Sequence, residues 1–247
     1  MVLRMILCAL SMLSLSAAGA KQAVANPCEH HVFEGDGFVV CSFDAQTQKL
    51  RLAWKSIAGT PYRSFAALSH EVDESKLAFA MNAGMYDQAG SPIGLYVEQA
   101  RELKSISITA GPGNFYMKPN GVFWIDADGD PHVSATDDYI AAARQPTWAT
   151  QSGPMLVIGG QLHPDFQPDG ASRYSRNGVG VSGRHTALFV ISDRPVSFGK
   201  LARLFRDGLH CDDALYLDGA VSSLWAPSLG RSDSGNPLGP LVVVTSP

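Results

Sequence analysis

The sequence predicts an α+β fold: a central, mostly antiparallel sheet with a few flanking helices, in a single domain. Short runs rich in β-branched and aromatic residues recur along the chain, whereas few stretches show helical spacing. The 24 glycines and 15 prolines place turns between these runs. Runs of strands with occasional helices are typical of the α+β class. Residues 21–247 suit one domain by length.

The first half of the chain is expected to contain a hairpin, a helix and several strands. Apolar runs at 38–40 and 50–54 flank a polar turn and predict the hairpin. Phe65, Leu68, Val72 and Leu77 follow helical spacing. They predict a helix over 64–77. Further strands are expected at 77–81, 94–97, 105–109 and 121–125, and an acidic hairpin turn at 126–130.

The second half continues with a more regular pattern. Helices are predicted at 137–143 and 198–207. Strands are predicted at 151–158, 179–181, 187–192, 214–217 and 241–244. Residues 162–176 are polar and rich in Pro, Gly, Ser and Asp, which predicts an exposed loop of the kind that often carries binding residues.

Residues 1–20 have the layout of a cleavable signal peptide. Arg4 is the only charged residue, an apolar run covers 5–15, and small residues stand at Ala18 and Ala20. The run is shorter than the roughly 20 apolar residues that span a bilayer, and no later segment is long and apolar enough. The protein is therefore expected in the periplasm or outside the cell, without an integral membrane segment.

Three cysteines would remain after signal removal. Cys28 and Cys41 flank a turn at 34–37, so a hairpin could bring them together as a disulfide. A bond across this separation stabilises by about 3 kcal/mol in the loop-entropy model. Cys211 precedes an apolar strand and is expected to be a small buried residue.

The charge pattern argues against nucleic acid as the main partner. The chain has 19 basic and 23 acidic residues, for a formal net charge of −4, and contains no basic run. An anionic ligand would therefore need a local pocket.

Polar residues and glycines gather where predicted strands end. Four segments have this character: 82–87, 151–154, 192–195 and 218–223. Each places an amide, carboxylate or hydroxyl at a strand end, with a glycine or proline nearby, so all four could converge on one pocket. Asn and Asp before Gly are also common turn residues. Asp218 is harder to explain in that way, because it ends a fully apolar strand and needs hydrogen bonds or a cation if buried.

The polar loop also contains candidate anion ligands. Arg173 and Arg176 lie in an otherwise uncharged stretch, and the planar guanidinium suits phosphate, although two solvated surface arginines are an equal alternative. The histidines lack the spacing of zinc enzymes. A divalent cation, calcium or magnesium, held by Asp87, Asp193 and Asp218 is the open cofactor alternative.

Five segments within residues 77–225 carry a family signal. They are Asn82-Ala83-Gly84-Met85-Tyr86, Gln151-Ser152-Gly153-Pro154-Met155-Leu156, Ser175-Arg176-Asn177-Gly178-Val179-Gly180, Ser192-Asp193-Arg194 and Leu217-Asp218-Gly219. Together with Gly113-Asn114-Phe115-Tyr116 and Lys118-Pro119-Asn120-Gly121, they resemble the phosphodiester glycosidase family. The resemblance implies site positions for Asn82, Arg176, Asp193, Asp218 and Ser222. Where the family's best known member has Asp-Gly-Gly-Gly-Ser, this chain has Asp218-Gly219-Ala220-Val221-Ser222, which predicts a narrower pocket.

The resemblance implies a hydrolase that cleaves the glycosidic bond of a small or polymeric sugar 1-phosphodiester. Arg176, helped by Asn177 and Lys118, would hold the phosphate. Asp218 would act at the anomeric carbon as nucleophile or base, with Asp193 as a second carboxylate. The residues expected to bind substrate or line the pocket are Asn82, Gln151, Ser222, Asn114 and Tyr86. The alternatives are a non-catalytic binder of sugars or cell-wall polymers, and a metal-dependent phosphodiesterase.

Overall fold

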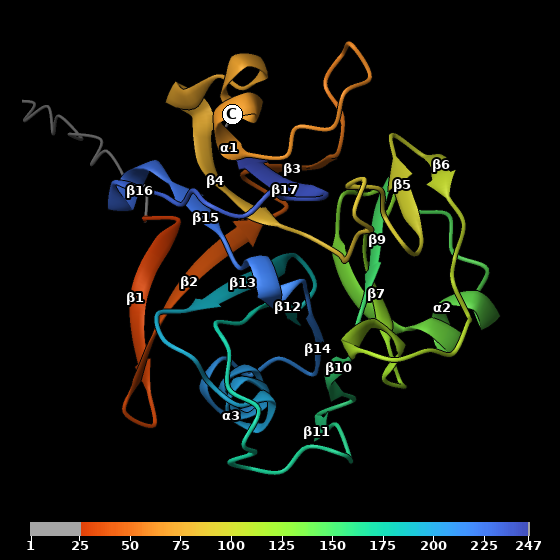
Figure 1. The fold of residues 1–247 in the computed structure, drawn as a ribbon, viewed down its shortest axis with the longest axis vertical. Helices are drawn as coiled ribbons and strands as arrows, with labels where there is room; N and C mark the ends of the chain where they lie inside the picture. The colour runs from red at the N-terminus through yellow and green to blue at the C-terminus, as the bar shows by residue number, and fades with distance from the viewer. Residues whose placement is uncertain (1–25, 247) are drawn as a thin grey trace, which may run out of the picture.

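The computed structural model describes residues 26–246, which form three antiparallel sheets (Figure 1). This agrees with the predicted α+β class of mostly antiparallel strands and few helices. The predicted signal peptide lies outside the described residues. Within 26–246, no helix has the length and apolar character that crossing a bilayer requires.

A seven-stranded sheet combines the first two strands of the chain with five strands from its second half. Its order is β1 (Cys28–Phe33), β2 (Asp36–Asp44), β13 (Thr186–Ser192), β12 (Asn177–Ser182), β14 (Asp213–Tyr216), β10 (Met155–Ile158) and β11 (Gln161–Leu162). One five-stranded sheet has the order β16 (Arg231–Ser232), β15 (Leu224–Ala226), β4 (Leu77–Asn82), β17 (Leu241–Thr245) and β3 (Lys49–Ala53). The other has the order β6 (Arg101–Lys104), β5 (Tyr96–Glu98), β9 (Trp148–Ser152), β7 (Gly121–Ile125) and β8 (Pro131–Ala135).

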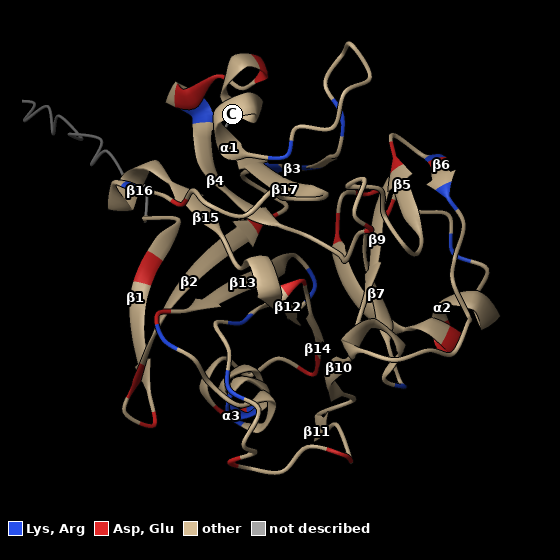
Figure 2. Cartoon of the chain, in the orientation of Figure 1, with Lys and Arg blue, Asp and Glu red and all other residues tan. Residues whose placement is uncertain are grey.

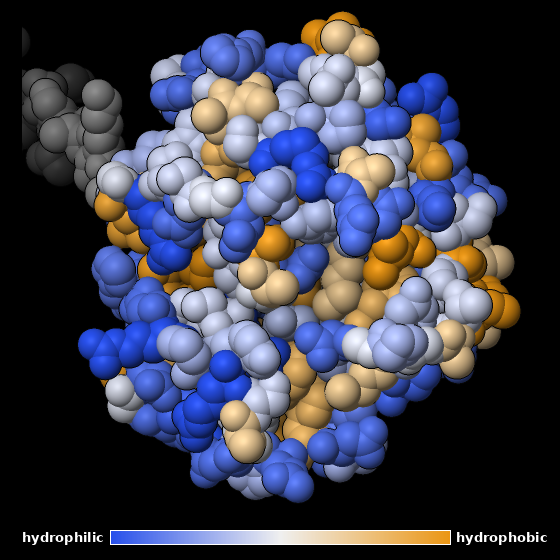
Figure 3. Space-filling view, in the orientation of Figure 1, coloured by the Kyte–Doolittle hydropathy of each residue, from blue (hydrophilic) through white to orange (hydrophobic). Residues whose placement is uncertain are grey.

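The helices are short and flank the sheets. The α-helices are α1 (Phe65–Leu68), α2 (Thr136–Ala141) and α3 (Phe198–Arg203), and α3 continues as a π-helical turn, η4 (Leu204–Gly208). The 3₁₀ turns are η1 (Ser69–Glu71), η2 (Glu74–Lys76), η3 (Asn114–Tyr116), η5 (Gly219–Val221) and η6 (Pro227–Leu229). Figure 2 shows acidic and basic residues interspersed along the chain, and Figure 3 shows a face that is mainly hydrophilic, with hydrophobic side chains in separate areas.

The core lies where the three sheets meet. Phe189 of β13 packs against Phe79 of β4, with ring centroids 5.5 Å apart, and against Phe123 of β7 at 5.4 Å. All three rings are at most 2% exposed. One aromatic cluster therefore holds together strands from all three sheets, and it fixes the positions of the strand ends that form the candidate site.

The predicted hairpin between 38–40 and 50–54 is wrong. β2 pairs with β1 and β13 in the seven-stranded sheet, whereas β3 pairs with β17 in another sheet. Residues 38–41 of β2 are buried on both faces, as expected of a central strand. The polar turn after β2 thus carries the chain from one sheet to the next.

The predicted helix over 64–77 is much shorter in the structure. Ser64 caps α1 by accepting a hydrogen bond from the Ala67 amide at 3.1 Å. The helix ends early because Val72 is extended and Asp73 caps the separate turn η2. A β-branched residue followed by a good capping residue interrupts the apolar spacing that predicted one long helix.

Two predicted strands also differ. The predicted strand 151–158 is split by Gly153 and a cis Pro154 into β9 and β10, which belong to different sheets. Residues 105–109 are irregular, because the expected strand lies at Arg101–Lys104 instead. The strands predicted at 121–125, 187–192 and 241–244 are confirmed, as are the hairpin turn at 126–130, the helix at 137–143 and the irregular loop at 162–176.

The cysteine predictions are confirmed. Cys28 of β1 lies directly opposite Cys41 of β2, and the two form a disulfide with Cα atoms 4.0 Å apart. Cys211 is free and buried. Burial raises the pKa of its thiol to about 12, so Cys211 has the properties of a buried apolar residue rather than of a nucleophile.

Candidate functional site

Two of the predicted strand ends, at Asn82 and Asp218, meet at one place, and Asn177, directly after the predicted polar loop, joins them. Asn82 ends β4, Asn177 begins β12, and Asp218 follows β14. The Asn82 Nδ2 group donates to the Asp218 carbonyl at 2.7 Å, and Asn177 Nδ2 donates to Asn82 Oδ1 at 3.0 Å. These bonds join the end of β4 to strands of the seven-stranded sheet. The expected convergence is therefore present for two of the four predicted segments, those of Asn82 and Asp218.

Ser222 and Ser223 close this network from the turn after Asp218. The Ser223 amide donates to Asn82 Oδ1 at 2.9 Å, and Ser222 Oγ lies 3.5 Å from Asn177 Oδ1. Asn82 and Asn177 are at most 1% exposed. We call Asn82, Asn177, Asp218 and Ser222 the Asp218 cluster. Its amides are largely satisfied by one another, so they fix geometry more than they offer free ligands.

Asp218 supplies the one carboxyl group of this cluster, and the residue is partly buried. Its amide donates to the Ala83 carbonyl at 3.2 Å, which holds the residue against the end of β4. Burial raises the pKa of the carboxyl to about 6, and a hydrogen bond from the Ala220 amide offsets part of this effect. Within residues 26–246 no basic side chain forms an ion pair with it. A partly buried carboxyl of this kind is a candidate acid or base.

Arg176 is fully buried behind the cluster. Only 1% of the side chain is exposed, and its guanidinium carbon lies 3.5 Å from the centroid of the Phe198 ring. Nε donates to the Val196 carbonyl at 2.9 Å and Nη2 to the Ser172 carbonyl at 3.0 Å, whereas Nη1 is buried without a partner. Burial lowers the pKa of this guanidinium. The arginine is thus a fixed positive charge in the interior.

Tyr216 lies between Arg176 and Asp218. Burial raises the pKa of Tyr216, Arg176 lowers it, and the charge of Asp218 raises it. The hydroxyl also lies beside Gly219, where any Cβ atom would overlap it. The close approach of the Tyr216 hydroxyl therefore requires a glycine at position 219. Arg176 and Asp218 both lie near this phenol.

Sequence analysis did not single out Tyr216 or Ser223. Tyr216 and Asp218 are two residues apart, the spacing that places side chains on one face of a strand, so a signal for Tyr216 was present. Ser223 takes part through its backbone amide, and no sequence pattern reports that.

Tyr86 lies beside the cluster, whereas the contacts of Asp193 are with Gly37 and Arg231. The Tyr86 hydroxyl donates to the Pro237 carbonyl, and burial and the charge of Asp218 both raise its pKa. Asp193 follows the end of β13 and has a side chain that is 39% exposed. Its Oδ1 lies 3.9 Å from Arg231 Nη1. Tyr86 is thus a neighbour of the Asp218 carboxyl, whereas the carboxylate of Asp193 faces Arg231.

Gln151 and Lys118 belong to a second polar group. Gln151 Oε1 accepts from the amides of Leu95 and Ser107, and its Nε2 donates to the Ser107 carbonyl and to Thr136 Oγ1. Asn120 Oδ1 accepts from Thr136 Oγ1 at 2.8 Å and from Lys118 Nζ at 2.9 Å. We call Gln151, Asn120, Thr136 and Lys118 the Gln151 cluster.

The two clusters adjoin at Gly84. A Cβ atom there would overlap the Gln151 carbonyl and Thr150 Oγ1. Asn114 begins η3, and its carbonyl lies beside Gly153, next to this second cluster. The strand end at 151–154 is therefore a neighbour of the Asp218 cluster, joined to it through the backbone.

The three aspartates considered for a divalent cation are not gathered together. Across residues 26–246, no group of three His, Cys, Asp or Glu side chains is arranged to hold a metal ion. Asp87 instead closes its own turn by accepting from the Ser91 amide at 2.9 Å.

Comparison with known proteins agrees with the motifs. Residues 75–244 match the family model of the phosphodiester glycosidases. The uncharacterized protein YigE of Escherichia coli strain K12 is 32% identical over 181 residues, which cover 73% of this chain and 70% of that protein.

Solved structures share the fold. The zebrafish N-acetylglucosamine-1-phosphodiester alpha-N-acetylglucosaminidase catalytic domain, auto-inhibited by its pro-peptide, aligns with a TM-score of 0.61 at 12% identity, over 92% of this chain and 86% of that one. A Burkholderia pseudomallei protein described as exported aligns with a TM-score of 0.55 at 13% identity, over 86% of this chain and 74% of that one. The family match covers more than half of the chain, and the chain therefore belongs to the phosphodiester glycosidase family.

Proposed function

We propose that this protein is an exported hydrolase that cleaves the glycosidic bond of a sugar 1-phosphodiester, with Asp218 acting at the anomeric carbon. Family membership supports hydrolase activity, and the zebrafish protein with the same fold is named for cleavage of such a bond. The disulfide between Cys28 and Cys41 supports an oxidising compartment outside the cytoplasm. The observation that carries the proposal is the Asp218 carboxyl, with a pKa near 6, at the meeting point of three strand ends.

A carboxyl with this pKa suits general base or nucleophilic catalysis near neutral pH. As a base, Asp218 takes a proton from water while the water oxygen bonds to the anomeric carbon. The bond from that carbon to the phosphate oxygen breaks, and the electron pair leaves with the phosphate monoester. As a nucleophile, Asp218 bonds to the carbon first and water releases the sugar in a second step. Asp193 is the second carboxylate in either scheme. Because the leaving group is already a stable anion, the reaction does not depend on a strong general acid.

The rest of the Asp218 cluster positions this carboxyl. Asn82 holds the Asp218 carbonyl at 2.7 Å, and Asn177 orients Asn82. The sugar would accept or donate hydrogen bonds at those polar atoms of Asn82, Asn177 and Ser222 that are not already bonded within the cluster. Arg176 is 1% exposed, so in this role it contributes a buried positive potential behind Tyr216 instead of a direct grip on phosphate.

Isotope labelling tests the bond that is broken. The purified protein is incubated with an N-acetylglucosamine 1-phosphodiester in oxygen-18 water, and label is expected in the sugar. Label in the phosphate would indicate cleavage on the phosphorus side, as in the metal-dependent phosphodiesterase alternative. Binding without product would indicate the non-catalytic sugar binder.

Replacement of Asp218 tests the assigned residue. Asp218→Asn keeps the shape of the side chain and removes its acid and base chemistry. The expected decrease in kcat is about 10²- to 10⁴-fold. Asp212→Asn, at an exposed position directly before β14, is the matched control and is expected to leave kcat unchanged. Near-normal turnover by Asp218→Asn would refute the role of this carboxyl.

A further inference from the structure

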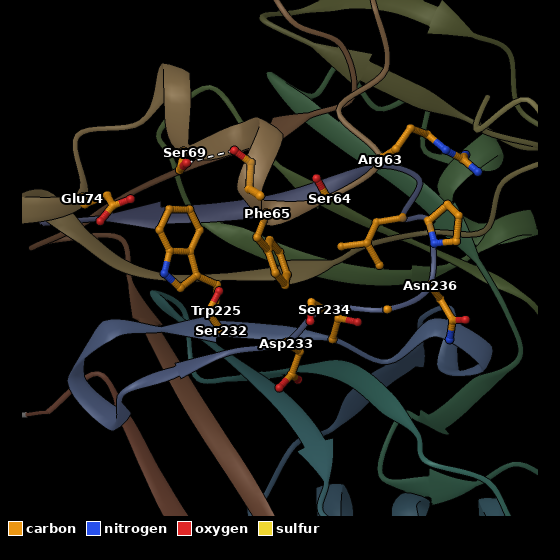
Figure 4. A pocket seen from close by; sticks show the side chains of 15 residues that line it. Arg63, Ser64, Phe65, Ser69, Glu74, Trp225, Ser232, Asp233, Ser234 and Asn236 are labelled. Carbon is orange, nitrogen blue, oxygen red and sulfur yellow. Dashed lines mark hydrogen bonds between the residues drawn. The ribbon is translucent and has the colours of Figure 1, made fainter.

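A cavity with a volume of about 530 Å³ lies between α1 and the loop at 232–238. The rings of Phe65 and Trp225 line it, with centroids 6.1 Å apart (Figure 4). Ser234 and Asn236 line it from the loop. The volume lies within the usual range for small-molecule sites, roughly 300–1,000 Å³. None of the expected site residues lines this cavity.

The cavity nevertheless borders the Asp218 cluster. Its lining includes Ser223, whose amide donates to Asn82 Oδ1 at 2.9 Å. The loop that forms its outer wall continues to Pro237, whose carbonyl accepts from the Tyr86 hydroxyl. Gly239 packs against the Tyr86 ring so closely that a Cβ atom would overlap it. The cavity therefore adjoins the Asp218 cluster at Ser223, and its loop contacts Tyr86 at Pro237.

Arg63 lies at the end of the cavity nearest to Tyr86. Its guanidinium carbon lies 5.2 Å from the centroid of the Tyr86 ring, and Gly90 packs directly against Nη1. Its backbone has φ +59°, in the left-handed region that residues other than Gly, Asn and Asp seldom adopt. Within residues 26–246 the guanidinium donates no hydrogen bond and forms no ion pair, and Nη1 is buried. A half-buried cation held in place without a counter-charge is suited to an anionic ligand.

Arg63 and Asp218 also lie near the same phenol. Burial raises the pKa of Tyr86, Asp218 raises it further, and Arg63 lowers it. The Asp218 carboxyl and the Arg63 guanidinium therefore both lie near the Tyr86 ring, and Arg63 lines the cavity. In a sugar 1-phosphodiester the phosphate likewise lies between the anomeric carbon and the esterified alcohol.

We infer that Arg63 binds the phosphate of the substrate and that the cavity beside it holds the alcohol esterified to that phosphate. This inference rests on the proposed function. The cavity combines aromatic surface with serine and asparagine groups, which suits an uncharged sugar or polyol. Glu74 and Asp233 also line it and disfavour a second anionic group in the alcohol. Arg63 precedes the segment 75–244 that matches the family, so this contact would be additional to the family motifs.

Variants of Arg63 test the phosphate contact. Arg63→Ala is expected to raise KM for a sugar 1-phosphodiester by about 10- to 100-fold with a smaller change in kcat. Arg63→Lys is expected to recover part of the loss, because charge remains but the planar fork is lost. Titration with inorganic phosphate, followed by calorimetry, should show binding to the wild type that Arg63→Ala weakens. Arg101→Ala, an exposed arginine of β6, is the control.

A variant of the loop tests the alcohol site. Ser234 is exposed, so Ser234→Trp is expected to fill the cavity without disturbing the fold. Two diesters with the same sugar are compared, one with a methyl group and one with a hexose as the alcohol. KM should rise about tenfold for the hexose diester only. Ser228→Trp, exposed and outside the cavity, is the control.

The outcomes separate this inference from the proposed function. If Asp218→Asn abolishes turnover while Arg63→Ala changes neither KM nor phosphate binding, the proposed function stands and this inference is wrong. Equal effects of Ser234→Trp on both diesters would remove the alcohol site. If the wild type cleaves neither diester, the proposed function fails, and equal phosphate binding by wild type and Arg63→Ala would overturn the anion site as well.

Discussion

The Asp218 cluster and the Gln151 cluster follow the same sequence rule but differ in their remaining hydrogen-bonding capacity. Both place buried amides at strand ends beside glycine. Gln151 uses its oxygen and its nitrogen twice each, on partners 15 to 56 residues away in the sequence. Within residues 26–246, the Asp218 carboxyl has no basic partner, and the buried Arg176 behind it has an Nη1 group without a hydrogen-bond partner. The first arrangement is closed, whereas the Asp218 carboxyl of the second retains capacity for a ligand.

The difference suggests that unused capacity separates functional polar residues from structural ones. A buried amide with all its partners stabilises the fold by holding distant segments together. A partly buried carboxyl or guanidinium without a counter-charge costs stability, so its retention points to a function. The following predictions test this distinction.

Gln151→Ala is expected to give the largest change in stability. The substitution leaves the amides of Leu95 and Ser107 without their acceptor, at about 1–3 kcal/mol for each buried group. Because residues 105–109 can regain water, the total loss in the free energy of unfolding should be about 3 kcal/mol. Urea unfolding measures it, with exposed Gln145→Ala as the control.

The activity of this variant decides whether the Gln151 cluster is structural. The folded fraction of Gln151→Ala should retain the kcat and KM of the wild type. A large rise in KM with unchanged stability would show that Gln151 binds substrate, as its motif first suggested, and the contrast between the clusters would be lost.

Asp218 should make the free energy of unfolding decrease as pH rises. An aspartate in an ion pair has the opposite effect, because its pKa is lowered in the folded state. The folded pKa is about 6, above the usual 3.8, so the folded state favours the protonated carboxyl. This contribution to stability is present below pH 4 and is lost as pH rises through 6. Between those values the wild type should lose about 1–3 kcal/mol relative to Asp218→Asn.

Urea unfolding at several pH values measures this difference. Subtracting the curve of Asp218→Asn removes the contribution of other titrating groups. A difference that stays constant from pH 4 to pH 7 would show that burial does not raise this pKa.

Much of the site could be predicted from the sequence because strand ends and glycines are local signals. Asn82 and Asp218 follow from the apolar runs before them, Asn177 follows from the motif around Arg176, and the Cys28 to Cys41 disulfide follows from a single turn. The burial of Arg176 could not be predicted, because the loop around it is polar. The residues that cover its side chain, Val196 and Phe198, come about twenty residues later in the sequence. The change of sheet after β2 also depends on pairing with β17, almost two hundred residues away.

Lys118→Ala should have the smallest effect, and it tests the closed cluster at its exposed end. Lys118 is exposed and donates a hydrogen bond to Asn120 Oδ1. When the lysine is removed, Asn120 Oδ1 still accepts a hydrogen bond from Thr136 Oγ1. The free energy of unfolding should therefore change by no more than about 0.5 kcal/mol, and KM by less than about twofold. Exposed Lys104→Ala is the control. A tenfold rise in KM for Lys118→Ala alone would place the substrate phosphate at Lys118, because only a ligand contact gives an exposed lysine an effect of that size. The Gln151 cluster would then belong to the binding site. Remaining hydrogen-bonding capacity would no longer distinguish the Asp218 cluster as functional from the Gln151 cluster as structural.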